Sequence, residues 1–147
     1  MDIINKIIEQ WEVDAKIDPT KITDASLSTP ILHSKYLHLL ADWKRKQSQV
    51  KNNLYSVKQL KIRYYRGELS KEELDKYQWK QWQYNKPLKN ELESLLQADK
   101  DVVKVQAQLE QVDTIVYVLD SIMTQIKQRD FEISNYIKIK MFERGEG

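Results

Sequence analysis

The sequence predicts an all-α protein built on a long helical hairpin, in which one helix carries a heptad pattern that favours self-association. Helix-breaking residues are rare: the chain of 147 residues holds three glycines and three prolines, and residues 31–66 and 88–144 contain neither. Charged residues reach 31% and apolar residues 41%, with a mean hydropathy of −0.67. Such a composition suits surface-rich helices better than a buried sheet. The length is enough for one domain with a core.

We expect a single all-helical domain, residues 1–147, made of successive segments. The first, residues 1–34, is an acidic N-terminal helix and connector. A short amphipathic helix is predicted because apolar residues recur at helical spacing, at Ile3, Ile4, Ile7, Ile8 and Trp11. Prolines at positions 19 and 30 then predict a loop or extended connector over residues 16–30. The opening residues are too charged for a signal peptide.

The second segment, residues 35–67, is a strongly basic part of a long helix expected from Ile31 to Arg66. It contains nine lysines and arginines and a single acid, Asp42. A solvated helix face usually mixes the two signs, so this excess of positive charge favours a face that follows phosphates. Tyrosines close the segment, and their rings can stack on unpaired bases. The candidate DNA-binding residues are Lys44, Lys51, Lys58, Lys61, Arg63, Tyr64, Tyr65 and Arg66.

The third segment, residues 68–129, combines an aromatic turn region with a heptad helix. A capping box between Ser70 and Glu73 opens a short helix. That helix is expected to carry four rings: Tyr77, Trp79, Trp82 and Tyr84. We interpret the rings mainly as hydrophobic packing, with a base-stacking platform as the alternative. A second long helix is expected from Pro87, since proline suits the first turn of a helix.

Apolar residues recur every seven positions along the second long helix. Eleven of the twelve seam positions between Leu88 and Ile126 are apolar, with Glu91 as the exception, which is coiled-coil spacing. A helix of about 40 residues would extend ~60 Å, so we expect other subunits to help cover the seam. The last segment, residues 130–147, is expected to add a third helix (Asp130–Glu143) for oligomerisation. The predicted oligomerisation residues are Val105, Leu109, Val112, Val116, Leu119, Met123, Ile126, Phe131 and Ile137.

The chain lacks the residues that most catalytic and metal sites require. It has no cysteine and only three glycines, which excludes cysteine nucleophiles, zinc-finger sites and a glycine-rich phosphate loop. His33 and His38 would point in different directions on a helix. The run Asp99-Lys100-Asp101 is interpreted as surface or inter-subunit ion pairs. We therefore expect no enzyme activity, no metal and no cofactor.

Four short motifs are spread along the chain: Ile-Asp-Pro-Thr-Lys at residues 17–21, Ser-Lys-Tyr-Leu at 34–37, Leu-Lys-Ile-Arg-Tyr-Tyr-Arg-Gly at 60–67 and Leu-Gln-Ala-Asp-Lys-Asp-Val-Val-Lys-Val at 96–105. They resemble the UvsY family of recombination mediators from T-even-type phages, which has Ile-Asp-Ser-Thr-Lys, Ser-Lys-Trp-Leu, Leu-Lys-x-Arg-x-x-Tyr-Tyr-x-Gly and Leu-Ser-Ala-Asp-Lys-Asp-Val-Leu-Lys-Val. The last match is the most specific. The Lys and Arg of the basic motif bind DNA in the family. The family has two more residues before its Tyr-Tyr pair, so Lys61 alone matches a basic position in both possible registers.

The resemblance implies a ring-like helical homo-oligomer, a hexamer or heptamer, that binds single-stranded DNA. It also implies a mediator that helps load a RecA-like phage recombinase onto DNA covered by the phage single-strand-binding protein, in the cytoplasm of the infected host cell. The residues alone leave two alternatives open. One is a coiled-coil scaffold whose basic face binds an acidic protein partner, and the other is a peripheral membrane protein that uses this face on anionic lipid.

Overall fold

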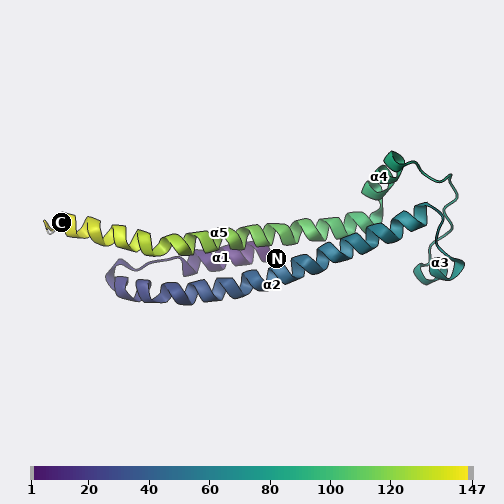
Figure 1. Cartoon of the computed structure of the whole chain (residues 1–147). Helices are drawn as coiled ribbons and strands as arrows, with labels where there is room; N and C mark the ends of the chain where they lie inside the picture. The colour runs from purple at the N-terminus through teal and green to yellow at the C-terminus, as the bar shows by residue number, and fades with distance from the viewer. Residues whose placement is uncertain (1, 146–147) are drawn as a thin grey trace. The chain divides into compact units, whose positions relative to one another are not determined.

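The computed structural model describes residues 2–145, and its elements are helices (Figure 1). In chain order they are α1 (Ile3–Asp14), the short 3-10 helix η1 (Pro19–Lys21), α2 (Ile22–Tyr65), α3 (Lys71–Tyr77), α4 (Lys89–Ala98) and α5 (Lys100–Glu143). No strand occurs among the described residues. The predicted all-α class is confirmed, and α2 and α5 are the two long helices of the predicted hairpin.

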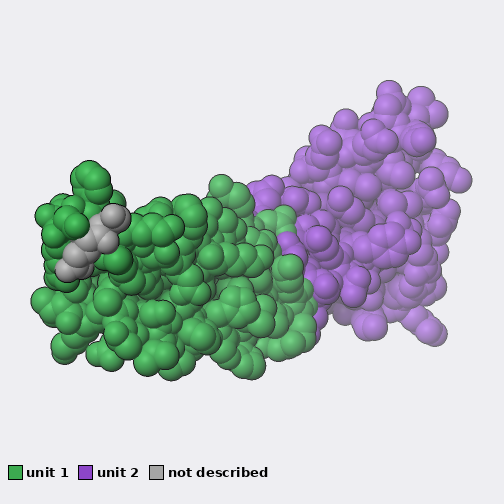
Figure 2. Space-filling model, turned by 60° about the vertical axis from the view of Figure 1, so that its left-hand side comes forward, with its two compact units in different colours: residues 1–45, 112–147 green, residues 46–111 purple. Residues whose placement is uncertain are grey.

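The chain forms two compact units (Figure 2). Unit 1 comprises residues 1–45 and 112–147, and unit 2 comprises residues 46–111. Their borders fall inside α2 and α5, so each long helix contributes one stretch to each unit. The sequence predicts segment borders near residues 34, 67 and 129, where the composition changes. Packing instead divides the chain within its two long helices.

The first long helix begins well before its expected start. The sequence predicts a connector over residues 16–30, but residues 22–30 of that range form the first turns of α2, and Pro30 lies inside the helix. A proline removes one hydrogen bond from a helix interior. Packing outweighs that cost here, because Ala25 and Thr29 are buried, and the Thr29 hydroxyl donates a hydrogen bond to the Ala25 carbonyl (3.3 Å). The connector prediction is therefore wrong over this range.

The second long helix differs from the prediction in two places: it contains a break, and it ends later than expected. It is broken at Asp99, whose backbone is extended between α4 and α5. Beyond that break α5 continues without interruption to Glu143, so the expectation of a separate third helix from Asp130 is wrong. No proline or glycine lies between residues 88 and 144, and nothing in the local sequence ends the helix near residue 130.

A tight turn ends α2 at Gly67. The Gly67 N–H donates to the Tyr64 carbonyl (3.0 Å) and the Glu68 N–H donates to the Arg63 carbonyl (2.9 Å), which is the Schellman pattern. Gly67 has a φ of 70°, and glycine adopts this left-handed conformation without a Cβ clash. The chain is thereby turned away from the basic helix towards α3.

The short helix α3 ends earlier than expected, at Tyr77. The Trp79 N–H donates to the Leu74 carbonyl (2.9 Å), and the Gln78 N–H donates to the Asp75 carbonyl (3.2 Å). Gln78 sits in the left-handed region with a φ of 59°, a conformation that costs energy for a residue with a side chain. Three of the four rings expected on the helix therefore follow it instead, and the left-handed turn brings Trp79 onto the Lys61 ammonium.

The core of unit 2 lies between the second half of α2 and the start of α5. Leu54 of α2 packs with Val102, Val105 and Leu109 of α5, and the partly buried Val50, Val57 and Leu96 surround them. Two of the predicted oligomerisation residues, Val105 and Leu109, are therefore buried within one chain.

Unit 1 uses the rest of the heptad seam for its own core. Within a single chain α5 buries the seam residues Val112, Val116, Leu119, Met123 and Ile126. Burial of each such side chain stabilises the fold by about 1.5–3 kcal/mol. The sequence-based expectation that these residues contact other subunits is corrected, since α1 and α2 supply cover inside the subunit that the periodicity alone does not reveal.

Polar contacts fix α1 in unit 1, beside α2 and α5 (Figure 1). The Asp14 carboxylate accepts hydrogen bonds from the Lys35 ammonium (2.6 Å) and the Tyr36 hydroxyl (2.8 Å). Burial by itself raises the pKa of Asp14, but these hydrogen bonds outweigh it and the pKa lies below its usual value. The buried Arg129 donates to the Ala15 carbonyl (3.2 Å), a favourable position for a cation because it lies at the C-terminal end of α1.

Replacing the seam residue Leu119 should destabilise the subunit. Leu119 is 0% exposed, so Leu119→Ala removes packed atoms and leaves a cavity, at a cost of about 2–5 kcal/mol. The matched control is Tyr117→Ala, also on α5 but 72% exposed, which should change the free energy of unfolding by about 0.5 kcal/mol or less. Urea unfolding followed by circular dichroism measures both. Equal effects of the two changes would contradict the assignment of the seam to the core.

Candidate nucleic-acid interface

In unit 2, Lys61 from the basic motif of α2 meets Asp99 and Asp101 at the start of α5. The Lys61 ammonium lies 3.2 Å from the Asp99 carboxylate and 2.8 Å from the Asp101 carboxylate. The Lys61 side chain is 8% exposed and that of Asp99 is 5% exposed. A buried charge costs much free energy unless it is paired and hydrogen-bonded, so these groups depend on one another. The interpretation of Asp99 and Asp101 as surface or inter-subunit ion pairs is corrected to a pairing inside the subunit.

Asp99 has a second role as the N-terminal cap of α5. Its carboxylate accepts hydrogen bonds from the N–H groups of Asp101 (2.9 Å) and Val102 (3.1 Å). These donors have no partner inside the helix, and the helix N-terminus attracts negative charge. One side chain therefore starts α5 and holds the cation of α2, which explains why the heptad segment breaks here.

Tyr65 completes the network around Asp99. Its hydroxyl donates to the Asp99 carboxylate at 2.6 Å, and burial together with this carboxylate raises the pKa of Tyr65. Burial alone also raises the pKa of Asp99. The hydrogen bonds from Tyr65 and Val102 and the charge of Lys61 outweigh burial, so the pKa of Asp99 lies below its ordinary value.

An aromatic cap covers the Lys61 side of this network. Trp79 lies against the ammonium of Lys61, which is 3.9 Å from the centre of the tryptophan rings. The rings of Tyr64, Tyr65 and Trp82 contact one another edge to face, at centroid distances of 4.8–6.1 Å. The Tyr64 hydroxyl also donates to the Lys80 carbonyl (2.7 Å). The interpretation of the aromatic turn region as mainly packing is confirmed for Trp79 and Trp82, whose rings contact Tyr64 and Tyr65.

The predicted DNA-binding residues fall into groups with different surroundings. Lys44, Lys51 and Arg66 are exposed, Lys44 in unit 1 and the other two in unit 2. Arg63 is also exposed but pairs with Glu73 (3.0 Å). The partly buried members are Lys58 and Tyr64, and the buried members are Lys61 and Tyr65. The charge count of the sequence treats these cations alike, whereas the fold assigns some of them to internal contacts.

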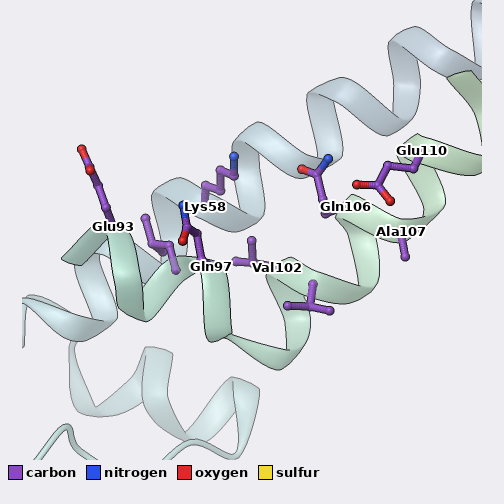
Figure 3. Close-up of a pocket in the computed structure, with 9 residues that line it drawn as sticks. Lys58, Glu93, Gln97, Val102, Gln106, Ala107 and Glu110 are labelled. Atoms are coloured by element: carbon purple, nitrogen blue, oxygen red, sulfur yellow. The ribbon is translucent and has the colours of Figure 1, made fainter. Parts of the chain in front are cut away.

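Lys58 lies at a groove of about 540 Å³ whose surroundings are of mixed charge (Figure 3). Glu93 and Gln97 of α4 line the groove together with Gln106 and Glu110 of α5. The strongly positive face expected for the basic segment therefore does not persist at Lys58. Glu93 of α4 and Glu110 of α5, which are distant from Lys58 in sequence, place negative charge around the same groove.

The two C-terminal members of the predicted oligomerisation set remain on the surface of the subunit. Phe131 is 69% exposed and Ile137 is 40% exposed. Further apolar side chains near them on α5 are exposed as well: Ile139, Met141 and Phe142. Their exposure within one subunit leaves these side chains available for contacts with other molecules.

The part of the chain that the structure describes forms neither a metal-ligand cluster nor a membrane-spanning helix. Within residues 2–145 no group of three or more His, Cys, Asp or Glu side chains is placed to hold a metal ion. No helix in the described part of the chain is long and apolar enough to cross a membrane.

Removing the cation of the buried network should destabilise unit 2 in a pH-dependent way. Lys61→Met leaves Asp99 charged and buried, at a cost of about 3 kcal/mol near neutral pH. Because the folded-state pKa of Asp99 is depressed, the stabilisation from this group is present above its unfolded pKa of about 3.9 and is lost as pH falls through the folded value. The difference in the free energy of unfolding between variant and parent should therefore become smaller in acid.

The control for that experiment is Lys51→Met, which removes an exposed lysine of the same helix and unit. It should change the free energy of unfolding by about 0.5 kcal/mol or less at any pH. Denaturant unfolding across an acid-to-neutral pH series measures all three proteins. A Lys61→Met variant as stable as Lys51→Met would contradict the structural role of the buried pair.

Comparisons with known proteins agree with this architecture. The family described as recombination, repair and single-stranded DNA binding protein UvsY matches residues 10–146. The recombination protein uvsY of Enterobacteria phage T4 is 26% identical over 140 residues, which cover 94% of this chain and 95% of that protein. A crystal structure of the bacteriophage T4 recombination mediator protein UvsY has the same fold, with a TM-score of 0.84 at 24% identity over 98% of each chain. A second crystal form gives a TM-score of 0.78 at 22% identity, over 95% of this chain and 98% of that one. Since the family match spans nearly the whole chain, the protein belongs to the UvsY family of recombination, repair and single-stranded DNA binding proteins.

Proposed function

We propose that this protein is a recombination mediator that binds single-stranded DNA as a homo-oligomer. In that role it helps load a RecA-like phage recombinase onto DNA covered by the phage single-strand-binding protein, in the cytoplasm of the infected host cell. Family membership over nearly the full chain is the observation that carries this proposal. A mediator of this kind needs no catalytic step of its own, so we propose no enzyme activity and no cofactor.

The exposed cations of the basic segment are the phosphate contacts in this proposal. Lys51 and Arg66 are exposed in unit 2, and phosphate contacts from lysine and arginine give affinity without sequence preference. Lys61 acts differently, because its ammonium is held by Asp99 and Asp101. Its part in DNA binding is to hold the surface that the other residues present.

Oligomerisation would raise the affinity of a weak basic surface. One subunit offers few cations, whereas a ring-like hexamer or heptamer would repeat them along a single strand. Binding at several linked sites can raise avidity by about 10²–10⁴. A strand held at several points would release single-strand-binding protein more readily and would be presented to the recombinase in a fixed conformation.

Neutralising the exposed cations should weaken DNA binding and its dependence on salt. For Lys51→Gln combined with Arg66→Gln, the plot of log affinity for an oligothymidylate against log salt should become shallower by about 0.7 for each phosphate that the protein no longer neutralises. Fluorescence anisotropy at several salt concentrations measures this. The control is Lys6→Gln with Lys21→Gln, which removes the same charge from exposed positions of unit 1.

If the two double variants bind alike, the basic segment of α2 does not bind the phosphates. If the parent protein instead binds anionic vesicles or an acidic polypeptide more tightly than DNA, one of the two alternative functions replaces the proposal.

Charges at the exposed apolar residues Phe131 and Ile137 of α5 should break the oligomer. Phe131→Glu with Ile137→Glu would place two carboxylates in an apolar contact between subunits, at a cost of several kcal/mol for each unpaired ion. Light scattering should show a smaller mass, and DNA affinity should fall with it. Val103→Glu, at a position of α5 that is 48% exposed in unit 2, should keep the parental mass. An unchanged mass in the double variant would place the subunit contact elsewhere.

A further inference from the structure

A second groove of unit 2 combines aromatic, amide and cationic side chains. It has a volume of about 450 Å³. Tyr77 and Trp79 line it from the segment at the end of α3, Asn53 lines it from α2, and Lys104 and Gln108 line it from α5. It is distinct from the groove beside Lys58, since the two share no lining residue.

The two rings in this groove are stacked and held in place. Tyr77 and Trp79 have centroids 4.8 Å apart and planes inclined by 25°. Trp79 is held by the Lys61 ammonium, which lies 3.9 Å from its ring centre, and by its backbone hydrogen bond to Leu74. Gln78, the residue between Tyr77 and Trp79 in sequence, has a strained left-handed backbone conformation. Strain of this kind is tolerated where the surrounding structure demands a fixed geometry.

Packing alone does not account for Tyr77. The other rings of the cap, Tyr64, Tyr65 and Trp82, fill the interior by edge-to-face contacts. Tyr77 stacks on the outside of this cluster and keeps 36% of its surface exposed. An exposed ring that already stacks on a neighbour needs little further ordering to accept another flat ring.

The polar side chains around the rings match the rest of a nucleotide. Lys104 is exposed on α5 and can contact a phosphate. Asn53 and Gln108 are exposed amides, each able to donate and accept hydrogen bonds at a base edge. The Asp101 carboxylate also lines the groove and shares the Lys61 ammonium with Asp99. These three groups together carry one net negative charge, which the cation of Lys104 offsets in the groove.

We propose that this groove is a nucleobase-stacking site, in which one base of a single-stranded DNA stacks on Tyr77 and its phosphate contacts Lys104. The site rests on the proposed function, because it specifies where a strand held by the basic segment places a base. Stacking on an aromatic ring tolerates any base sequence, as a protein that covers long stretches of DNA requires. The buried Lys61 would then serve DNA binding indirectly, by holding Trp79, on which Tyr77 stacks.

The experiment compares a normal strand with one that has no bases. Fluorescence anisotropy at fixed salt gives the affinity for an oligothymidylate and for an abasic deoxyribose-phosphate strand of equal length. The parent should bind the oligothymidylate more tightly. Tyr77→Leu should lose roughly tenfold in affinity for the oligothymidylate and little for the abasic strand. Tyr77→Phe, which keeps the ring, should bind as the parent does.

Two further variants complete the design. Tyr55→Leu removes a tyrosine of unit 2 that is 67% exposed and does not line the groove, so it should leave both affinities unchanged. Lys104→Gln alters an exposed residue and should fold normally. It should lower affinity for both strands and make the salt dependence shallower by about 0.7.

The outcomes separate this inference from the proposed function. A parent protein that binds neither strand overturns the proposed function together with the site. A parent that binds both strands equally, with Tyr77→Leu unchanged, overturns the stacking site and leaves the proposed function standing. If Tyr77→Leu does not fold, a Lys104→Gln variant with unchanged affinity and salt dependence overturns the site on its own.

Discussion

The buried Lys61 ammonium between Asp99 and Asp101 is the constraint on which unit 2 depends. It joins the last turns of α2 to the first turn of α5, although 38 residues separate Lys61 from Asp99 in sequence. Tyr65 and Trp79 close over the same charges. Because a buried ion is costly unless its partners are in place, the helix start, the ion pairs and the aromatic cap form together. A change at Lys61 therefore disturbs the start of α5 and the aromatic cap in addition to removing one charge.

This arrangement separates two uses of positive charge on one helix. Lys61 is neutralised internally, whereas Lys51 and Arg66 face solvent in the same unit. Weaker DNA binding after substitution of Lys61 would thus have two sources, a missing cation and a displaced aromatic cap. The stability of each variant tells them apart, because removal of an exposed cation leaves the fold intact. The resemblance of the basic motif to a DNA-binding motif is compatible with a residue that acts by positioning its neighbours.

The local patterns of the sequence predict that the chain is helical, but they predict neither all of the helix ends nor the packing partners of the helices. Seven-residue spacing correctly marks the side chains from Val102 to Ile126 as apolar contacts, yet it does not say whether a seam faces another subunit or α1 and α2 of its own chain. Pro30 indicates a helix boundary because its cost is local, while the burial of Ala25 that offsets this cost depends on tertiary packing. The capping role of Asp99 is readable from its motif in principle. Its pairing with Lys61 depends on chain topology, which periodicity does not specify.

The distribution of tryptophans gives each unit its own optical reporter. Trp11 and Trp43 belong to unit 1, and Trp79 and Trp82 belong to unit 2, which accounts for all four in the chain. Trp11 packs edge-on against Tyr36, whereas Trp79 lies against an ammonium group, so the two pairs have different electrostatic surroundings. Emission from chains that keep only one pair would follow the melting of one unit at a time. The same chains would reveal whether α2 and α5, which run through both units, make the two melt as one cooperative body.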